Sequence, residues 1–229
     1  MKNSKILIAS PTSKHKDYCF KGWSAHLKKL TYQADILLVD NTKDSGQYAK
    51  TVLSKHFKTI HIDWKQEDNL YSIITKSQNI IRNYTLYYRY EFLFLLESDQ
   101  MPNYNVIEYL LSLNKRVCSL PYFTYTAFQS KVLQFDTEDF GQIRQGHSMN
   151  LDKSFLNWDG ITKPKMQPGL GCILIHRSVL EKIKFRCDTD HASDTFFHED
   201  LNKLGIQCYC SELYFSEHHN SNWFNILKK

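Results

Sequence analysis

The chain has 229 residues, of which 42% are hydrophobic and 23% charged; this composition is typical of a globular protein and excludes a disordered or fibrous one. Its formal charge of +5 is spread along the sequence, which fits an anionic substrate and excludes a separate charged tail. No stretch reaches ~18 apolar residues, so we expect no membrane span.

The six cysteines lack the paired Cys-x-x-Cys spacing of a zinc site. The apolar run near the N-terminus, 5–10, is too short for a signal peptide and leads directly into the first predicted strand. Without a signal peptide, we expect reduced cysteines and a cytoplasmic protein, located in the host cytoplasm if the chain is viral.

Short apolar runs alternate with helical patterns in the first part of the chain. This alternation predicts an α/β fold with a parallel sheet and right-handed crossovers. Strands are predicted at 5–10, 34–39, 59–63 and 92–96, and helices at 17–30, 44–56 and 70–90.

Polar residues end three of these strands. They are Ser10-Pro11-Thr12 after the first strand, Asp40-Asn41 after the second and Glu97-Ser98-Asp99 after the fourth. Because the carboxyl ends of parallel strands meet at one edge of a sheet, we expect these residues to line a shared crevice.

The segment 92–102 (FLFLLESDQMP) carries the strongest single signal. Its apolar run predicts a strand buried on both faces, and Pro102 prevents the chain from continuing as a central strand. Glu97 and Asp99 are two residues apart, which suits a hard divalent cation that also holds a diphosphate. Taken alone, the same pair could be ordinary acidic residues at a solvated strand end.

The remainder of the chain is less regular. The stretch 136–165 is long and poorly periodic, which is typical of a functional loop or lid. Helices are predicted at 104–113, 178–183 and 192–204, and strands at 116–120, 131–135, 172–176, 207–210 and 213–216. Four further segments stand out, namely Ser77–Asn83 (SQNIIRN), Pro168–Gly171 (PGLG), Ser193-Asp194 and Glu217-His218-His219.

In their order and spacing, these segments resemble the nucleotide-sugar glycosyltransferases of the GT-A fold, closest to the family-2-like inverting enzymes. The resemblance covers roughly Lys5 to His219. It implies a Rossmann-like, mostly parallel sheet flanked by helices and a single domain over 1–229. Within that domain, 1–102 would bind the nucleotide sugar, and 103–229, with the loop 136–165, would form the acceptor and catalytic half.

The resemblance also implies the donor-binding and metal-binding residues. Asp99 would be the direct metal ligand, assisted by Glu97 and by His218, whose imidazole would favour Mn²⁺ over Mg²⁺. Because adjacent strand residues face opposite ways, only one of His218 and His219 can point at this site. The implied donor-binding residues are Ser10, Pro11, Thr12, Asp40, Asn79, Arg82, Glu97, Ser98 and Gly171.

The general base is implied by the family's Glu-Asp motif. Ser193-Asp194 has the spacing of that motif to the later Gly205, although Ser193 replaces the glutamate. We therefore expect Asp194 to take the proton from an acceptor hydroxyl, through an oxocarbenium-like transition state. Asp200, in a literal Glu-Asp pair that lies closer to Gly205, is the second candidate.

Several assignments have a purely structural alternative. Asp40 could cap a turn, Arg82 could lie on a solvated helix face, and Asp194 could be favoured by a helix N-terminus. Gly171 could serve only close backbone packing.

Two other functions remain open at this point. A nucleotidyltransferase shares the sheet and the metal–diphosphate chemistry, but the segment 10–16 has no glycine for its usual loop. A non-catalytic sugar-binding or nucleic-acid-binding module could also keep the fold. For a transferase, the acceptor could be a glycan, a protein or a hydroxymethylated DNA base, and a DNA base would have to leave the stack.

Overall fold

The computed structural model describes residues 5–125, 131–133, 135–136, 167–211 and 214–219. Its centre is a seven-stranded sheet in which all neighbours run parallel except β11, which is antiparallel to both β4 and β6. The predicted α/β fold with a mostly parallel sheet is therefore confirmed. In spatial order the strands are β12 (Tyr209–Cys210), β6 (Val117–Ser119), β11 (Cys172–His176), β4 (Phe92–Leu96), β1 (Ile6–Thr12), β2 (Asp35–Asp40) and β3 (Lys58–His61).

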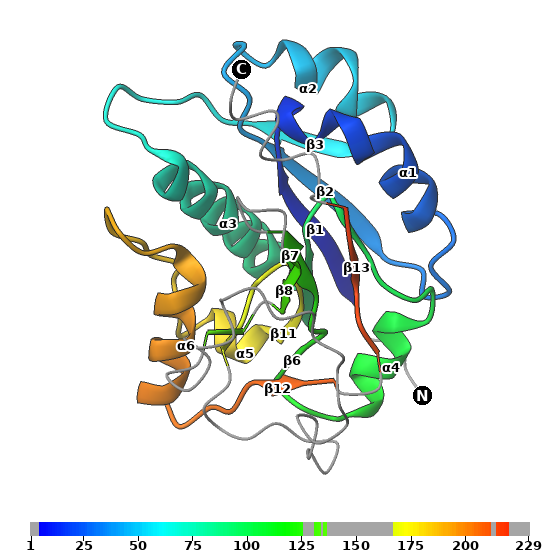
Figure 1. The fold of residues 1–229 in the computed structure, drawn as a ribbon, viewed down its shortest axis with the longest axis vertical. Helices are drawn as coiled ribbons and strands as arrows, with labels where there is room; N and C mark the ends of the chain where they lie inside the picture. The colour runs from blue at the N-terminus through cyan, green and yellow to red at the C-terminus, as the bar shows by residue number, and fades with distance from the viewer. Residues whose placement is uncertain (1–4, 126–130, 134, 137–166, 212–213, 220–229) are drawn as a thin grey trace.

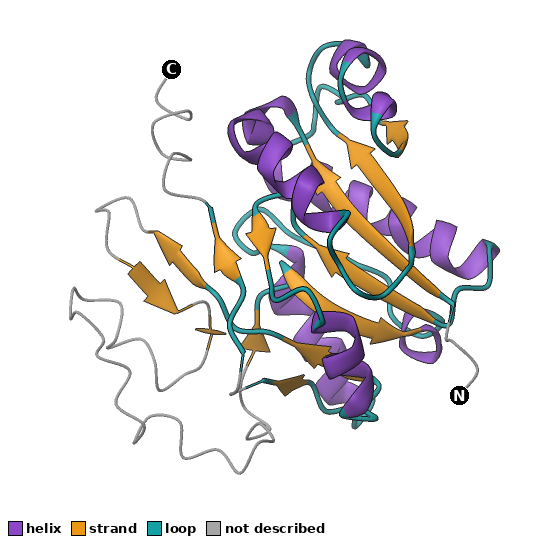
Figure 2. Ribbon diagram, turned by 90° about the vertical axis from the view of Figure 1, so that its right-hand side faces the viewer, coloured by secondary structure: helices purple, strands orange, loops and turns teal. Residues whose placement is uncertain are grey.

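Helices cover both faces of this sheet (Figures 1 and 2). One face packs against α3 (Leu70–Tyr87), α5 (Arg177–Leu180) and α6 (Ser193–Lys203), and the other against α1 (Asp17–Leu27), α2 (Gln47–Thr51) and α4 (Val106–Ser112). On β4, Leu93 and Leu95 belong to the first core, whereas Phe94 and Leu96 belong to the second. The continuous apolar run thus forms a strand buried on both faces, as predicted.

Most predicted elements are present with shorter limits, but two differ. The helix expected over 44–56 is divided at Val52 into α2 and the 3₁₀ helix η2 (Leu53–Lys55). The last strand, expected at 213–216, lies instead at β13 (Glu217–His218). It pairs antiparallel with β5 (Gln100–Met101), the segment that directly follows Glu97 and Asp99.

Residues 137–166 contain nearly all of the expected functional loop and lie outside the described residues. The strands on either side, β9 (Phe135–Asp136) and β10 (Gln167–Pro168), pair with each other antiparallel. Another small antiparallel pair is formed by β7 (Phe123–Tyr125) and β8 (Lys131–Leu133). Within the described part of the chain, none of the helices combines the length and the apolar character that a membrane crossing requires.

Side chains of α3 hold this helix against the segment that follows α5. Asn79 Nδ2 donates to the carbonyl of Phe185 (2.8 Å), and Asn79 Oδ1 accepts from the N–H of the same residue (3.1 Å). Arg82 Nε donates to the carbonyl of Ile183 (2.7 Å). Asn79 and Arg82 were expected to line a nucleotide pocket; in the structure both contact the backbone of the segment after α5, which supports a packing role for them. The signal in SQNIIRN is therefore better explained by burial of backbone polar groups, which must find partners.

Replacing Asn79 with Ala should lower the free energy of unfolding by about 1–3 kcal/mol, because the N–H and C=O of Phe185 lose their partners. Urea unfolding followed by circular dichroism measures this change. Asn83→Ala, on the exposed part of the same helix, is the matched control and should change stability by less than about 0.5 kcal/mol. Equal stability of Asn79→Ala and the wild type would contradict the packing role.

Candidate active site

The polar ends of β1, β2 and β4 meet at one edge of the sheet, as predicted. Thr12 Oγ1 lies 2.9 Å from Ser98 Oγ, and the N–H of Asn41 donates to the carbonyl of Thr12 (2.9 Å). Ser10 is fully buried, and its hydroxyl donates to the carbonyl of Pro11 (3.1 Å). Thr12 and Ser98 therefore contact each other at this edge, whereas Ser10 lies buried behind it and bonds to the backbone of Pro11.

Glu97, Asp99 and His218 come together at this edge. One potential ligand atom from each residue lies within 4.8 Å of the others. His218 Nε2 is 3.3 Å from Asp99 Oδ2. Asp99 is fully buried, and its Oδ1 has no hydrogen-bond partner among the described residues. Two carboxylates, an imidazole and an unsatisfied buried oxygen fit a divalent cation such as Mn²⁺ or Mg²⁺.

Strand pairing explains how a residue so late in the chain reaches this cluster. In the β5–β13 register, His218 lies opposite Gln100, and the N–H of His219 donates to the carbonyl of Asp99 (2.8 Å). The side chain of His219 lies elsewhere, with its Nε2 3.2 Å from Glu217 Oε1. Of the two adjacent histidines, His218 is the one that faces the carboxylates, which agrees with the alternation of side chains along a strand.

The two carboxyl groups of the cluster have different electrostatic environments. Burial favours a raised pKa for Asp99, but the Lys16 ammonium, in an ion pair with Asp99, and His218 outweigh burial and hold that pKa below its usual range. Burial raises the pKa of Glu97, and the neighbouring carboxylates of Asp99 and Asp194 add to this despite the opposing charge of Lys16. Asp99 is therefore the permanent anion of the cluster, and Glu97 is the group that more readily holds a proton.

Gly171 supports the cluster from behind. Its carbonyl accepts from the N–H of Glu97 (2.8 Å), and its own N–H donates to Tyr122 Oη (3.2 Å). A Cβ atom at position 171 would lie 2.7 Å from that hydroxyl oxygen. The ring centres of Tyr122 and His218 are 5.1 Å apart, and the two rings meet edge to face. Gly171 therefore also influences the position of His218, because it leaves room for the Tyr122 ring. We had expected Gly171 at the cofactor, but its contacts favour the close-packing alternative.

The two candidate bases occupy different environments on α6. Ser193 Oγ donates to Gln78 Oε1 on α3 (2.5 Å), which fixes the start of α6. The next residue, Asp194, is near enough to the cluster that its charge adds to the raised pKa of Glu97. Asp200 instead accepts two hydrogen bonds from Arg186 (2.8 and 3.1 Å), and these lower the pKa of Asp200. Asp200 is thus occupied by Arg186, whereas the charge of Asp194 acts on Glu97, so Asp194 is the better candidate for a base at this cluster.

Asp40 has internal partners for both carboxylate oxygens. Its Oδ2 lies 2.6 Å from His61 Nδ1, and its Oδ1 accepts from the hydroxyl of Thr42 (2.5 Å). Asp44 joins Asp40 and His61 in a second group of potential metal ligands. Because Asp40 is fully buried and already paired, it shapes the end of β2 rather than presenting an open carboxylate.

A hollow of about 380 Å³ opens beside the ends of β2 and β3. Trp64 Nε1 donates to the carbonyl of Asn41 (2.5 Å), and Lys43 Nζ lies 4.1 Å from the centre of the Trp64 ring. An indole beside polar groups is a suitable surface for a planar ring. The hollow is lined by Thr42, Lys43, Asp44, Ser45, Asp63, Trp64, Lys65, Gln66 and Asp68.

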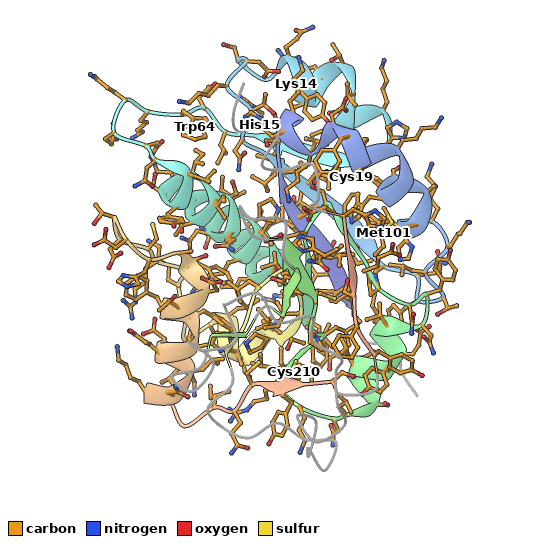
Figure 3. All side chains as sticks on the ribbon, in the orientation of Figure 1. Lys14, His15, Cys19, Trp64, Met101 and Cys210 are labelled. Atoms are coloured by element: carbon orange, nitrogen blue, oxygen red, sulfur yellow. The ribbon has the colours of Figure 1, made fainter. Side chains whose placement is uncertain are left out.

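Sequence reasoning missed the lining of this hollow and also missed Lys16. Trp64 lies in the loop between β3 and α3, where periodicity gives no signal. The run Lys14-His15-Lys16 forms the 3₁₀ helix η1 directly after β1, and these basic residues at a strand end were the available clue. In Figure 3, Lys14, His15, Cys19 and Trp64 lie toward the end of the sheet where β1 to β3 terminate. Cys19 Sγ lies 3.3 Å from the carbonyl oxygen of Ser98, and burial raises the pKa of this thiol to about 12, so it stays protonated.

Neither a family model nor a curated protein matches the sequence. Solved structures do match in fold. The TarS 1–349 structure of S. aureus in complex with UDP-GlcNAc has a TM-score of 0.59 and 14% identity over 96% of this chain and 60% of that one. The mannosyltransferase PcManGT of Pyrobaculum calidifontis, solved with GDP-Man and Mn²⁺, has a TM-score of 0.57 and 10% identity over 93% of this chain and 56% of that one.

The chain has the GT-A type of glycosyltransferase fold. A mycobacterial protein of known structure also matches, with a TM-score of 0.56 and 10% identity over 95% of this chain and 68% of that chain. This chain spans about 63% of the TarS 1–349 fragment. At such low identity the likeness establishes the fold, and the chemistry has to be argued from the residues described above.

Gly171→Ala should destabilise the protein by about 1–3 kcal/mol, because the new methyl group displaces Tyr122 and, through it, His218. Urea unfolding measures this change. Gly22→Ala is the matched control: it lies in α1, where the new Cβ meets Met101 Cε at an ordinary 3.4 Å. This control should leave stability unchanged or raise it by up to ~1 kcal/mol. If both variants are as stable as the wild type, Gly171 is not a close-packing position.

Proposed function

We propose that the protein is a glycosyltransferase that moves a sugar from a nucleoside diphosphate sugar to a hydroxyl acceptor, that is, a hexosyl- or pentosyltransferase. The observation that carries this proposal is the Glu97–Asp99–His218 cluster at the carboxyl edge of a GT-A-type sheet. A likeness to structures solved with UDP-GlcNAc and with GDP-Man and Mn²⁺ supports the same donor class. As before, we propose one domain over 1–229, with the donor half at 1–102.

The donor would lie across the edge formed by the ends of β1, β2 and β4. Its base fits the hollow beside Trp64, where an aromatic face and several polar groups are available. Thr12 and Ser98, which contact each other there, lie between this hollow and the carboxylates. Asp99, Glu97 and His218 would hold Mn²⁺ or Mg²⁺, and such a cation supplies Lewis-acid neutralisation of the leaving diphosphate.

Asp194 would act as the general base. Its place at the start of α6, fixed by the Ser193–Gln78 hydrogen bond, keeps its carboxylate near the cluster. In the proposed reaction, Asp194 accepts the proton of the acceptor hydroxyl while the hydroxyl oxygen attacks the anomeric carbon. Attack from the face opposite to the leaving diphosphate would invert the configuration at that carbon.

The acceptor is proposed only as a hydroxyl compound. A glycan, a protein and a hydroxylated DNA base each remain possible acceptors, and 103–229 is the part of the chain that would select among them. We propose a cytoplasmic location, because all six cysteines are free, as expected in a reducing compartment.

In a thermal-shift assay, UDP or GDP and their sugars should raise the melting temperature in the presence of Mn²⁺ or Mg²⁺ but not with a chelator. Asp99→Asn should remove this metal-dependent rise and abolish transfer, because it removes the permanent anion of the cluster. Release of a nucleoside diphosphate supports a glycosyltransferase, whereas release of pyrophosphate would indicate the nucleotidyltransferase alternative. A fully active Asp99→Asn protein would rule out the proposed metal site.

Asp194→Asn should reduce the turnover rate at least about 100-fold, the usual contribution of a general base, while nucleotide and metal still bind. Steady-state transfer assays and the thermal shift measure the two effects separately. Asp200→Asn is the matched control: it should keep most of the activity and lose some stability with the Arg186 contact. The reverse pattern would assign the base to Asp200.

A further inference from the structure

Lys16 places a positive charge beside Asp99, the residue proposed to bind the metal ion. Its ammonium group forms an ion pair with Asp99 Oδ2, the same oxygen that lies 3.3 Å from His218 Nε2. The side chain of Lys16 is only 18% exposed, so this ammonium is largely shielded from water. A resident cation thus already balances the charge of the buried Asp99 carboxylate.

The backbone that carries Lys16 is held in place, so only the side chain is available to move. The N–H of Lys16 donates to the carbonyl of Ser13 (2.9 Å), and its carbonyl accepts from Cys19 Sγ (3.1 Å). The N–H of Lys14 donates to Thr42 Oγ1 (2.9 Å), which ties η1 to the end of β2. A lysine on this anchored segment has a flexible four-carbon side chain and can exchange one anionic partner for another.

Two cations at one carboxylate oxygen repel each other strongly in a shielded site. A divalent ion bound by Asp99 and His218 would therefore compete with the ammonium of Lys16. A diphosphate relieves this competition, because it brings negative charge to the same edge and offers the ammonium a new partner. The metal and the diphosphate should then favour each other's binding.

We propose that Lys16 is an internal counter-ion that holds Asp99 in the donor-free protein and moves to the diphosphate when the donor and the metal bind. This inference rests on the proposed function, since it assumes the metal and diphosphate positions given above. Its consequence is that free metal binds weakly and that metal and nucleoside diphosphate bind cooperatively. By linkage, each ligand must raise the affinity of the other by the same factor.

The test measures Mn²⁺ binding by the electron paramagnetic resonance signal of free Mn²⁺, with and without UDP or GDP. In the wild type, the nucleotide should tighten Mn²⁺ binding at least about tenfold, because it withdraws the competing ammonium from Asp99. In Lys16→Met, Mn²⁺ alone should bind about tenfold more tightly than in the wild type, and the further tightening by the nucleotide, which comes from direct contact of the diphosphate with the metal, should be about tenfold smaller than in the wild type. Lys14→Met, an exposed neighbour on η1, is the matched control and should behave as the wild type.

Three results would overturn the proposal. If Lys16→Met binds Mn²⁺ alone no better than the wild type, Lys16 does not compete with the metal, although the metal site itself stands. If the nucleotide does not tighten Mn²⁺ binding in the wild type, the counter-ion role is rejected. This result decides the question even where Lys16→Met does not fold. If no protein binds Mn²⁺ with or without nucleotide, the proposed metal site fails and this inference fails with it.

Discussion

The organisation of this protein depends on one buried carboxylate. Asp99 is fully buried, and an ionised group without partners in such a place would cost several kcal/mol. The fold meets this requirement from three separate parts of the chain. Lys16 comes from the segment after β1, His218 comes from β13 at the other end of the described chain, and β5 holds the backbone next to Asp99. The cluster is therefore a tertiary feature, and its parts are far apart in the sequence.

The two sides of the sheet edge are built on different principles. On the side of β1 to β3, polar groups surround a hollow, and side chains such as Trp64 and Lys43 remain near its surface. On the side of β11 and α6, packing dominates: Tyr122 fills the space left by Gly171, and Ser193 joins α6 to α3. A recognition surface thus lies next to a rigid support, which is the arrangement that precise chemistry requires.

The sequence predicted those features that follow from local rules. The buried strand before Glu97 was clear from its apolar run, and the gathering of the strand ends follows from parallel pairing alone. His218 was found through a resemblance, because no local pattern connects it with Asp99; only the β5–β13 register does. Asn79 shows the limit of motif reading, since a polar residue on a helix can serve the backbone of a distant segment as readily as a ligand.

The features that sequence reasoning missed depend on side-chain placement across the fold. Lys16 lies in a short 3₁₀ helix, and its pairing with Asp99 depends on how that helix is tied to neighbouring strands. The hollow beside Trp64 is formed by two turns, and turns carry little periodic signal. The positive net charge was consistent with an anionic substrate, but it could not indicate which lysine pairs with a carboxylate.

The orientation of β11 gives that strand two ends of unequal importance. In the seven-stranded sheet that the structure describes, it alone runs against its neighbours, so its amino end at Cys172 lies beside Leu96 and its carboxyl end at His176 lies beside Phe92. The first end carries Gly171 into the cluster, whereas the second continues into α5 at the opposite edge. Tolerance to substitution should therefore change along this strand. Both chemistry and packing restrict the residues at its amino end, and only packing restricts those at its carboxyl end.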